Sequence, residues 1–236
     1  MKLLRFGERG AERPGLVGPS GEIRDLSPHI DDISGDVLGA EGLQRIRQIE
    51  IDALSVVEGQ PRLGPPVADI PNLIAIGLNY ADHAREAGME IPEEPVIFSK
   101  STSCISGPND DVVMPHGSRR TDWEVEIAFV MGSRAKNVTK ENALSHVAGY
   151  CICNDVSQRD WQLESTGQWI KGKSHETFGP LGPWLVTIDE IPDPQALDIF
   201  LEVNGERMQS SNTNQMIFPI VELVSIVSTF MTLLPG

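Results

Sequence analysis

Two glutamates stand two residues apart in an extended, mostly apolar stretch of the sequence. The stretch from Asp122 to Met131 reads D-W-E-V-E-I-A-F-V-M, and its glutamates are Glu124 and Glu126. Because side chains alternate faces along a strand, a strand here points both carboxylates the same way. Neighbours on one strand face lie about 6.5 to 7 Å apart at Cα, which lets two carboxylates converge on one cation. Two such anions repel each other unless a proton or a metal ion lies between them.

The glutamate pair alone leaves two interpretations. The strand face that carries the pair continues with Ala128 and Val130, and these apolar residues favour the mouth of a cavity. The alternative is a strand with one solvated end, where both glutamates are ordinary surface charges, since most carboxylates are exposed. A second signal is needed to choose between them.

A third carboxylate provides that signal. Val147 to Asn154 predicts a buried strand, and Ser157 with Asp160 three residues later fits a capping box that opens a helix. Asp155 falls at the turn between this strand and this helix, where side chains are commonly presented to a site. With the two glutamates it would form an all-oxygen site for a hard divalent cation, Mg2+ or Mn2+, with positions left for water or substrate.

Two further pairs of residues are spaced to share a helix face. Arg159 and Gln162 are three residues apart and could reach a substrate at the metal. A second helix, predicted from Asn79 to Gly88, carries His83 and Glu86 at the same spacing. A carboxylate beside an imidazole raises its basicity, which suits a general base that takes a proton from water near neutral pH. The alternative is a surface pair with no part in catalysis.

Five runs of sequence, found in order between Ile70 and Gly236, carry a resemblance to a known family. They are G-L-N-Y-A-D-H-A-R-E, D-W-E-V-E-I, G-Y-C-I-C-N-D-V-S-Q-R-D-W-Q, G-K-S-H-E-T-F-G-P-L-G-P-W and V-N-G-E-R-M-Q. Together they resemble the fumarylacetoacetate hydrolase family. A further run, Q-L-E-S-T-G-Q-W-I-K-G-K, is similar to bacterial members that hydrolyse 2,4-diketo-3-deoxy sugar acids, a group related to the acylpyruvate hydrolases.

The resemblance implies roles for individual residues. It places the His83–Glu86 pair on a lid helix that closes over the metal. It also implies that Lys173, in the G-K-S run, stabilises a developing oxyanion, and that Tyr80 contacts the substrate. Asp82 matches a position that is a further metal ligand in some relatives, and its part is left open.

The sequence also departs from the family pattern. His175 and Glu176 stand where Phe-Asp is commoner, which puts the local geometry in doubt. Family members usually continue, past the point where this sequence reaches Gly236, through an acidic strand and a T-G-T-P loop whose threonine contacts the substrate. We therefore expect either a truncated chain or an incomplete active site.

The implied fold is α+β and mostly β, a mixed β-roll with a small N-terminal domain over residues 1–66 and a catalytic domain over residues 67–236. The implied reaction is metal-dependent hydrolysis of a C–C bond in a 2,4-dioxo acid, which releases pyruvate, in a homodimer. One alternative is another metal-enolate reaction of the superfamily: oxaloacetate decarboxylation, hydration, isomerisation or a ureidoglycolate lyase reaction. Another is a non-catalytic binding protein. A glycosidase with Glu124 and Glu126 as its acid pair would explain neither Asp155 nor Lys173.

Composition limits the partners. The 236 residues carry a net charge of −15, which argues against nucleic acid because no excess of Lys or Arg replaces phosphate counterions. No apolar run approaches the ~20 residues of a membrane span, and the N-terminus lacks a signal-peptide core, so we expect a cytoplasmic protein. Cys104, Cys151 and Cys153 match no zinc spacing and are predicted to be buried thiols.

The surrounding elements follow from local patterns. Residues 16–26 predict a hairpin around G-P-S-G, and residues 40–57 predict an amphipathic helix. Four prolines between residues 61 and 71 mark a stiff connection. Beyond it, residues 73–77 predict a short strand before the helix of His83, and residues 217–234 predict a long buried helix.

Overall fold

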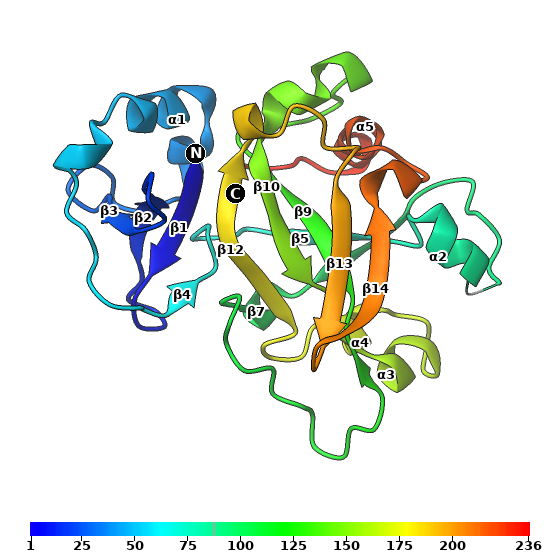
Figure 1. The fold of residues 1–236 in the computed structure, drawn as a ribbon. Helices are drawn as coiled ribbons and strands as arrows, with labels where there is room; N and C mark the ends of the chain where they lie inside the picture. The colour runs from blue at the N-terminus through cyan, green and yellow to red at the C-terminus, as the bar shows by residue number, and fades with distance from the viewer. Residues whose placement is uncertain (87) are drawn as a thin grey trace.

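A mixed eight-stranded sheet organises the chain in the computed structural model, which describes residues 1–86 and 88–236 (Figure 1). Its main path runs β3 (Ile23–Asp25), β2 (Arg13–Val17), β1 (Lys2–Phe6), β12 (Gly179–Thr187), β10 (Val147–Asn154) and β9 (Val125–Met131). Two short strands join this path, β4 (Leu63–Gly64) on β1 and β7 (Ile105–Ser106) on β12. The pairing is antiparallel except between β7 and β12.

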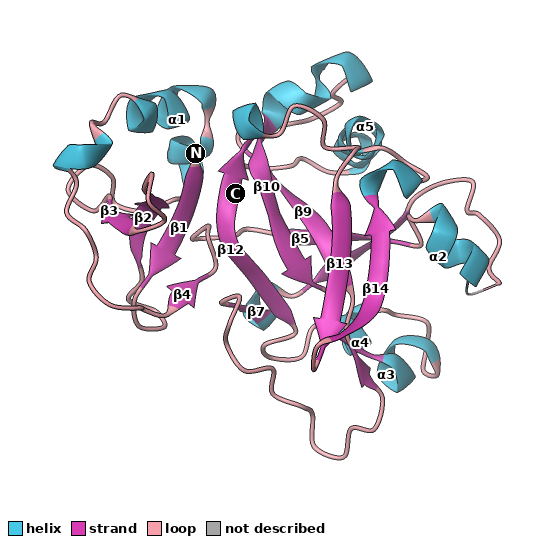
Figure 2. Cartoon of the chain, viewed as in Figure 1, coloured by secondary structure: helices cyan, strands magenta, loops and turns pink. Residues whose placement is uncertain are grey.

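Three two-stranded sheets and short helices surround this sheet (Figure 2). The small sheets are β5 (Leu73–Gly77) with β6 (Val96–Lys100), β8 (Thr121–Asp122) with β11 (Ser157–Gln158), and β13 (Asp198–Val203) with β14 (Glu206–Asn212). The α-helices are α1 (Ala40–Arg47), α2 (Ala81–Glu86), α3 (Arg159–Leu163), α4 (Ile170–Lys173) and α5 (Ile220–Phe230). Short 3-10 helices span Gly35–Leu38, Ile51–Ala53, Thr102–Cys104, Lys140–His146, Ile188–Glu190 and Thr213–Gln215. The predicted α+β, mostly β class is confirmed.

Strand β9 separates two hydrophobic clusters, as its alternating sequence predicts. Ala128 and Val130 belong to the cluster that also holds Cys151 of β10. Ile127 and Phe129 point to the opposite cluster, which includes residues of α5. Both faces of this strand are therefore covered, and Glu126 shares the face of Ala128 and Val130.

The N-terminal strands are continuous with the rest of the fold. Strand β1 pairs with β12, where Leu3 lies opposite Leu185, and both side chains are buried in one cluster. Arg62 donates to Asp110 and to Glu12, which adds ion pairs between the N-terminal segment and the segment after β7. The boundary between residues 66 and 67 stays a prediction, but the sheet and the core both cross it.

Two predicted helices are shorter in the structure because the residues at their predicted ends form backbone hydrogen bonds with other segments. The first ends at Arg47, since Val57 donates to the carbonyl of Ile23 (2.8 Å) and Asp25 donates to the carbonyl of Ser55 (3.0 Å). These bonds pull residues 55–57 against β3. The last helix covers only Ile220–Phe230, because Leu233 and Ala135 exchange two backbone hydrogen bonds of 2.9 Å. Local helix patterning loses to strand pairing at both places.

Two expectations from composition can be compared with the structure. Cys104, Cys151 and Cys153 are free and buried, as predicted. Within residues 1–86 and 88–236, none of the helices is both long enough and apolar enough to span a membrane.

Replacing Leu3 tests whether the N-terminal strands share the core of the sheet. Leu3→Ala is expected to lower the free energy of unfolding by about 2 to 5 kcal/mol, because it opens a cavity at a fully buried position. Val56→Ala is the control, since Val56 is 51% exposed and its change should cost about 0.5 kcal/mol or less. Urea denaturation measures both. Equal, small losses for the two variants would contradict a shared core.

Candidate active site

The three predicted carboxylates come together at adjoining ends of β9 and β10. Glu124 lies just before β9, and its carbonyl accepts a hydrogen bond from the backbone of Asp155 (2.8 Å), so the strand ladder continues past Asn154. Glu126 pairs with Cys153 in the same ladder. The two segments that sequence reasoning combined are therefore neighbours, and Asp155 lies beside the glutamates.

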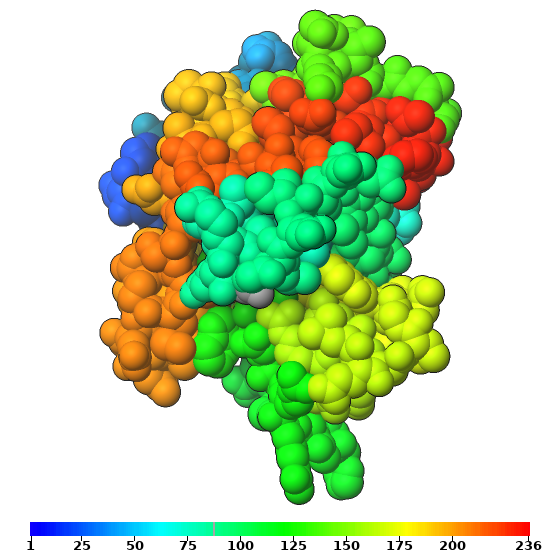
Figure 3. All heavy atoms as spheres, turned by 90° about the vertical axis from the view of Figure 1, so that its right-hand side faces the viewer, coloured from blue at the N-terminus to red at the C-terminus, as the bar shows by residue number. Residues whose placement is uncertain are grey.

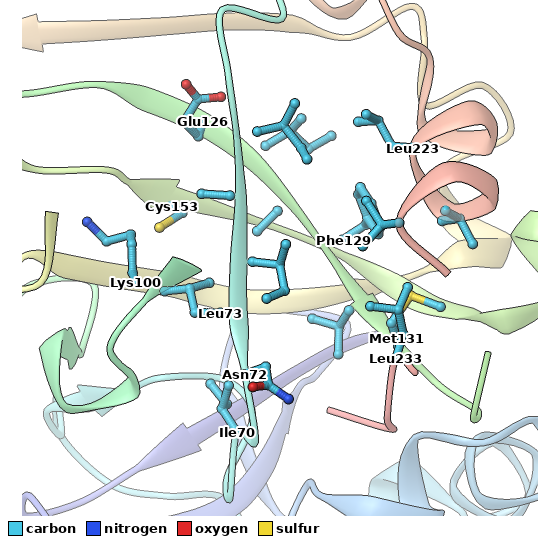
Figure 4. A pocket seen from close by; sticks show the side chains of 18 of the residues that line it. Ile70, Asn72, Leu73, Lys100, Glu126, Phe129, Met131, Cys153, Leu223 and Leu233 are labelled. Carbon is cyan, nitrogen blue, oxygen red and sulfur yellow. The ribbon is translucent and has the colours of Figure 1, made fainter. Parts of the chain in front are cut away.

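Two of these carboxylates lie at the polar end of a mostly apolar cavity. Glu126 and Asp155 both line it, together with Lys100. In Figure 4, Glu126 and Lys100 mark one end, and the labelled side chains of Phe129 and Leu223 extend towards the other. The site therefore combines charged groups with a low-dielectric wall, which strengthens electrostatic interactions.

Two buried lysines hold Asp155. Lys173 Nζ donates to Asp155 Oδ2 and to Glu124 Oε2, both at 2.7 Å, and Lys100 Nζ donates to Asp155 Oδ1 at 2.5 Å. Lys173 is 2% exposed and Lys100 is 3% exposed. Because an unpaired buried ammonium is very costly, these ion pairs fix the positions of both lysines and of the aspartate.

Sequence reasoning missed Lys100. It is the last residue of β6 and pairs with Leu73 of β5, which places it on the small sheet beside the cavity. The only signal in the sequence is that a lysine ends an otherwise apolar strand. This signal is not specific, because surface lysines also stand at the ends of strands. Only the packing of β6 against the Asp155 segment shows that this lysine is buried.

Arg159 and Gln162 share a face of α3, as their spacing predicts. Arg159 Nη1 donates to Gln162 Oε1 (3.0 Å) and to Glu124 Oε1 (2.5 Å). Its Nε and Nη2 donate to Asp122 Oδ2 (2.9 and 2.7 Å). The guanidinium is thus directed at Glu124 and Asp122, and Glu124 is held by two cations, Arg159 and Lys173.

The predicted capping box at the start of α3 is wrong. Ser157 belongs to β11, pairs with Asp122, and its hydroxyl donates to the carbonyl of Asp155 (2.9 Å). The N-cap residue of α3 is Gln158, whose side-chain amide donates to Asp160. Strand pairing with β8 takes Ser157 out of the cap position. Ser157 still contributes to the site, because its hydroxyl group holds the backbone of Asp155 in place.

Glu126 differs electrostatically from the other two carboxylates. Within residues 1–86 and 88–236, no side chain donates a hydrogen bond to it. Burial raises the pKa of Glu126 to about 8, and repulsion from Glu124 and Asp155 adds to this effect. Glu126 is therefore the acidic group of the site that most needs a compensating cation or a proton.

Tyr80 also faces this region. Its hydroxyl is buried and has no hydrogen-bond partner within the described chain. Burial raises the pKa of Tyr80, with further contributions from Glu126 and Asp82. The Asp82 carboxylate accepts from the Ser211 hydroxyl of β14 (2.6 Å). Tyr80 thus supplies an unsatisfied polar atom near Glu126, where a ligand could pair with it.

The histidine pair lies on the surface. His83 and Glu86 are both exposed on α2, and the structure as described shows no hydrogen bond between their side chains. Figure 3 shows the segment around α2 on the molecular surface next to the β13–β14 hairpin. Asn79, predicted to cap this helix, instead exchanges two hydrogen bonds with the backbone of Phe218 (3.1 and 2.9 Å). Ala87, within the predicted helix, lies outside the described residues.

The donor chemistry suits a hard divalent cation, but the carboxylates are not gathered as a formed metal site. Among the residues that the structure describes, no group of three or more His, Cys, Asp and Glu could hold a metal ion as arranged. Instead, the ammonium group of Lys173 forms ion pairs with one oxygen of Glu124 and one oxygen of Asp155. Three neighbouring carboxylates, one of them without an ion-pair partner among the described residues, still match the all-oxygen set that Mg2+ and Mn2+ prefer.

Comparison with known proteins defines the family. The family described as "Fumarylacetoacetate (FAA) hydrolase C-terminal" matches residues 72–236. The chain belongs to the fumarylacetoacetate hydrolase family. A protein of Burkholderia cenocepacia (strain HI2424), named as a hydrolase without a substrate, is 56% identical over 236 residues, which are 100% of this chain and 84% of that protein.

Two solved structures share the fold. Fumarylacetoacetate hydrolase from Exiguobacterium antarcticum is 35% identical with a TM-score of 0.84, over 100% of this chain and 84% of that one. Maleylpyruvate hydrolase from Sphingobium sp. SYK-6, in complex with manganese(II) and pyruvate, is 29% identical with a TM-score of 0.83, over 100% of this chain and 86% of that one. The expectation of this family and fold is confirmed.

The raised pKa of Glu126 predicts how stability depends on pH in metal-free protein. A carboxyl whose folded pKa, about 8, exceeds its ordinary value of 4.5 stabilises the fold when protonated, and this contribution is lost as the pH rises through 8. Glu126→Gln cannot ionise. From pH 5 to pH 9, wild-type protein in EDTA should therefore lose a few kcal/mol relative to the variant, since one pKa unit corresponds to about 1.4 kcal/mol.

Urea unfolding at both pH values measures this difference. Glu58→Gln, a change at an exposed carboxyl, is the matched control and should follow the wild type. A constant difference between wild type and Glu126→Gln across this range would show that Glu126 ionises like a surface glutamate.

Proposed function

We propose that this protein is a divalent-metal-dependent hydrolase that cleaves a C–C bond in a 2,4-dioxo acid and releases pyruvate. The observation that carries the proposal is that Lys173 joins Glu124 to Asp155 by ion pairs, while Asp155 and Glu126 line the polar end of one cavity. Family membership supports it, and so does the likeness to a maleylpyruvate hydrolase crystallised with manganese(II) and pyruvate. The proposal keeps the homodimer that the family resemblance implies and the cytoplasmic location that the sequence pattern predicts.

The proposed metal ligands are Glu124, Glu126 and Asp155. A bound Mg2+ or Mn2+ would supply Lewis-acid chemistry, drawing electrons from the 2-oxo acid group of the substrate. It would also offset the negative charge that burial and repulsion concentrate on Glu126. The net charge of −15 repels an anionic substrate. A bound cation would make the electrostatic potential positive where the substrate binds.

The proposed acid–base step belongs to His83, assisted by Glu86. His83 takes a proton from a water molecule, and the oxygen of that water forms a bond to the carbon of the 4-carbonyl group. The bond between carbons 3 and 4 then breaks, and its electron pair stays on carbon 3. Carbon 3 gains a proton, which completes pyruvate, and the other fragment leaves as a carboxylic acid. Tyr80, directly before α2, lines the same cavity as Glu126, so α2 begins beside the site.

The remaining polar residues would position the substrate and stabilise charge. Lys173 donates to the oxyanion that forms at the 4-carbonyl oxygen. Gln162 has its Oε1 held by Arg159, so its amide N–H groups are oriented to bind the substrate carboxylate. Arg159 acts through this contact and through Glu124, and Tyr80 offers its unpaired hydroxyl.

Product analysis tests the reaction directly. Incubation with an acylpyruvate, with a 2,4-diketo-3-deoxy sugar acid and with oxaloacetate should yield pyruvate and a carboxylic acid from at least one diketo substrate. EDTA should abolish the reaction, and Mg2+ or Mn2+ should restore it. Pyruvate and carbon dioxide from oxaloacetate alone would identify a decarboxylase. If no diketo substrate yields pyruvate with either metal present, the hydrolase proposal fails.

Paired lysine variants test the oxyanion role. Lys173→Met should lower kcat by about 10²- to 10³-fold, because the only donor proposed for the oxyanion is removed. Lys171→Met is the control on the same helix, since Lys171 is exposed and, among the described residues, its ammonium donates hydrogen bonds only to Ser165 and Thr166. Steady-state kinetics measures both, with circular dichroism to verify folding. Similar kcat values for the two folded variants would exclude Lys173 from the chemistry.

A further inference from the structure

Trp169 lies directly before α4, the short helix that carries Lys173, and its indole contacts both strands of the β5–β6 sheet. Gly77, the last residue of β5, has no side chain, and a Cβ atom at this position would overlap Cζ3 and Cη2 of the Trp169 ring. Phe98 of β6 packs edge-on against the same indole, with ring centroids 5.3 Å apart and ring planes at 63°. The indole therefore occupies a seat that a side chain at position 77 would close.

The ring of Phe98 connects Trp169 to the ammonium of Lys173. Lys173 Nζ lies over this ring, 5.5 Å from its centroid, which is within the range in which an aromatic face attracts a cation. An ammonium has three N–H groups, and two of those on Lys173 donate to Glu124 and Asp155. Attraction to the ring limits how far the ammonium can move, and the third N–H is the one that could donate to a substrate oxyanion.

Backbone contacts fix the rest of α4. A Cβ atom at Gly172 would lie 2.6 Å from the backbone nitrogen of Gln162, so α4 packs directly on α3. At the end of α4, the Ser174 hydroxyl accepts a hydrogen bond from the backbone of Ser101, just after β6 (2.8 Å). These contacts hold the second half of the helix, and Trp169 holds its start against β5 and β6.

An indole beside such a helix can act in two ways. It can stabilise the fold alone, by burying apolar surface, or it can also set the position of a group that reacts. The contacts favour the second role, because they lead from the indole through Phe98 to a buried ammonium. A displacement of about 1 Å at a group that meets the reacting atoms can cost on the order of 10²-fold in rate.

We propose that Trp169 is a positioning residue for Lys173. Seated on Gly77, the indole holds the Phe98 ring against the Lys173 ammonium and shields that ammonium from water. The catalytic consequence rests on the proposed function, in which Lys173 stabilises the oxyanion. The placement of Lys173 does not depend on that function and can be measured separately.

Chemical labelling of lysines tests the placement without substrate. Lys173 is 2% exposed, so acetic anhydride should label it slowly in the wild-type chain, whereas exposed Lys171 should react quickly. Trp169→Ala should raise the labelling rate of Lys173 at least about tenfold, because loss of the indole opens a path to the ammonium, and should leave that of Lys171 unchanged. Mass spectrometry measures both rates. Trp184→Ala is the matched control: Trp184 lies beside a different lysine, Lys2, so its loss should leave Lys173 protected.

Steady-state kinetics measures the catalytic consequence. Trp169→Ala should lower kcat at least about tenfold with little change in KM, because the oxyanion forms only in the transition state. Trp169→Phe, which keeps an aromatic ring next to Phe98, should restore most of the lost kcat. In a Lys173→Met background, Trp169→Ala should have no further effect on kcat, since a residue that acts through Lys173 has nothing left to position.

Gly77→Ala tests the seat from the opposite side. Its methyl group would overlap the indole, so this variant should reproduce the faster labelling of Lys173 and the lower kcat of Trp169→Ala. In the double variant the methyl group meets no indole, and the two effects should not add. Additive losses of kcat would show that the two residues act separately and would overturn the proposal.

The outcomes distinguish the placement of Lys173 from the proposed reaction. Faster labelling of Lys173 in Trp169→Ala, but not in Trp184→Ala, supports the proposal. Unchanged labelling of Lys173 in both Trp169→Ala and Gly77→Ala would overturn it, and so would an equal loss of kcat in the wild-type and Lys173→Met backgrounds. If the wild-type chain cleaves no diketo substrate, the proposed function fails, and the labelling rates alone decide the placement.

Discussion

The burial of Asp155 between two lysines is the interaction on which the site depends. Each oxygen of this carboxylate accepts from a buried ammonium, Lys100 on one side and Lys173 on the other. Removing either cation would leave a buried charge without its partner, which is far costlier than losing a surface ion pair. Lys173 also contacts Glu124, so the strand end of β9, the turn after β10 and the short helix α4 are held as one unit. The arrangement places strong charges beside an apolar cavity without leaving them free to rearrange.

The large sheet supplies the rigidity that this cluster needs. β10 lies between β9 and β12, and β12 carries β1 of the N-terminal segment, so the strands that present Glu126 and Asp155 are supported from one side by the whole sheet. On the other side, β9 has a free edge, and the cavity follows it. The charged end is thus fixed by strand pairing and ion pairs. Glu126 lies where these two regions meet, which explains why its charge is the least compensated.

Much of the site follows from sequence pattern, because strand alternation and ladder register are local properties. Period-two alternation placed Glu126 with Ala128 on one face of β9, and the polar residue after a buried strand located Asp155. Helical spacing paired Arg159 with Gln162. Sequence pattern could not show that Arg159 turns towards Asp122, that Lys100 is buried, or that Ser157 joins a strand. Each of these depends on which distant segment packs alongside, as β8 does for Ser157 and residues 55–57 do for the shortened helix α1. Tertiary contacts decide between local preferences of similar strength.

The proposed function depends most on one property, which is that Glu124, Glu126 and Asp155 would together bind a single divalent cation. Calorimetric titration of the metal-free protein with Mn2+ tests it most directly, with Asp155→Asn as the site variant and Asp111→Asn, at an exposed position, as the control. The account predicts one ion bound per chain in the wild type and in Asp111→Asn, and loss of that binding in Asp155→Asn. Unchanged Mn2+ binding in Asp155→Asn would contradict it.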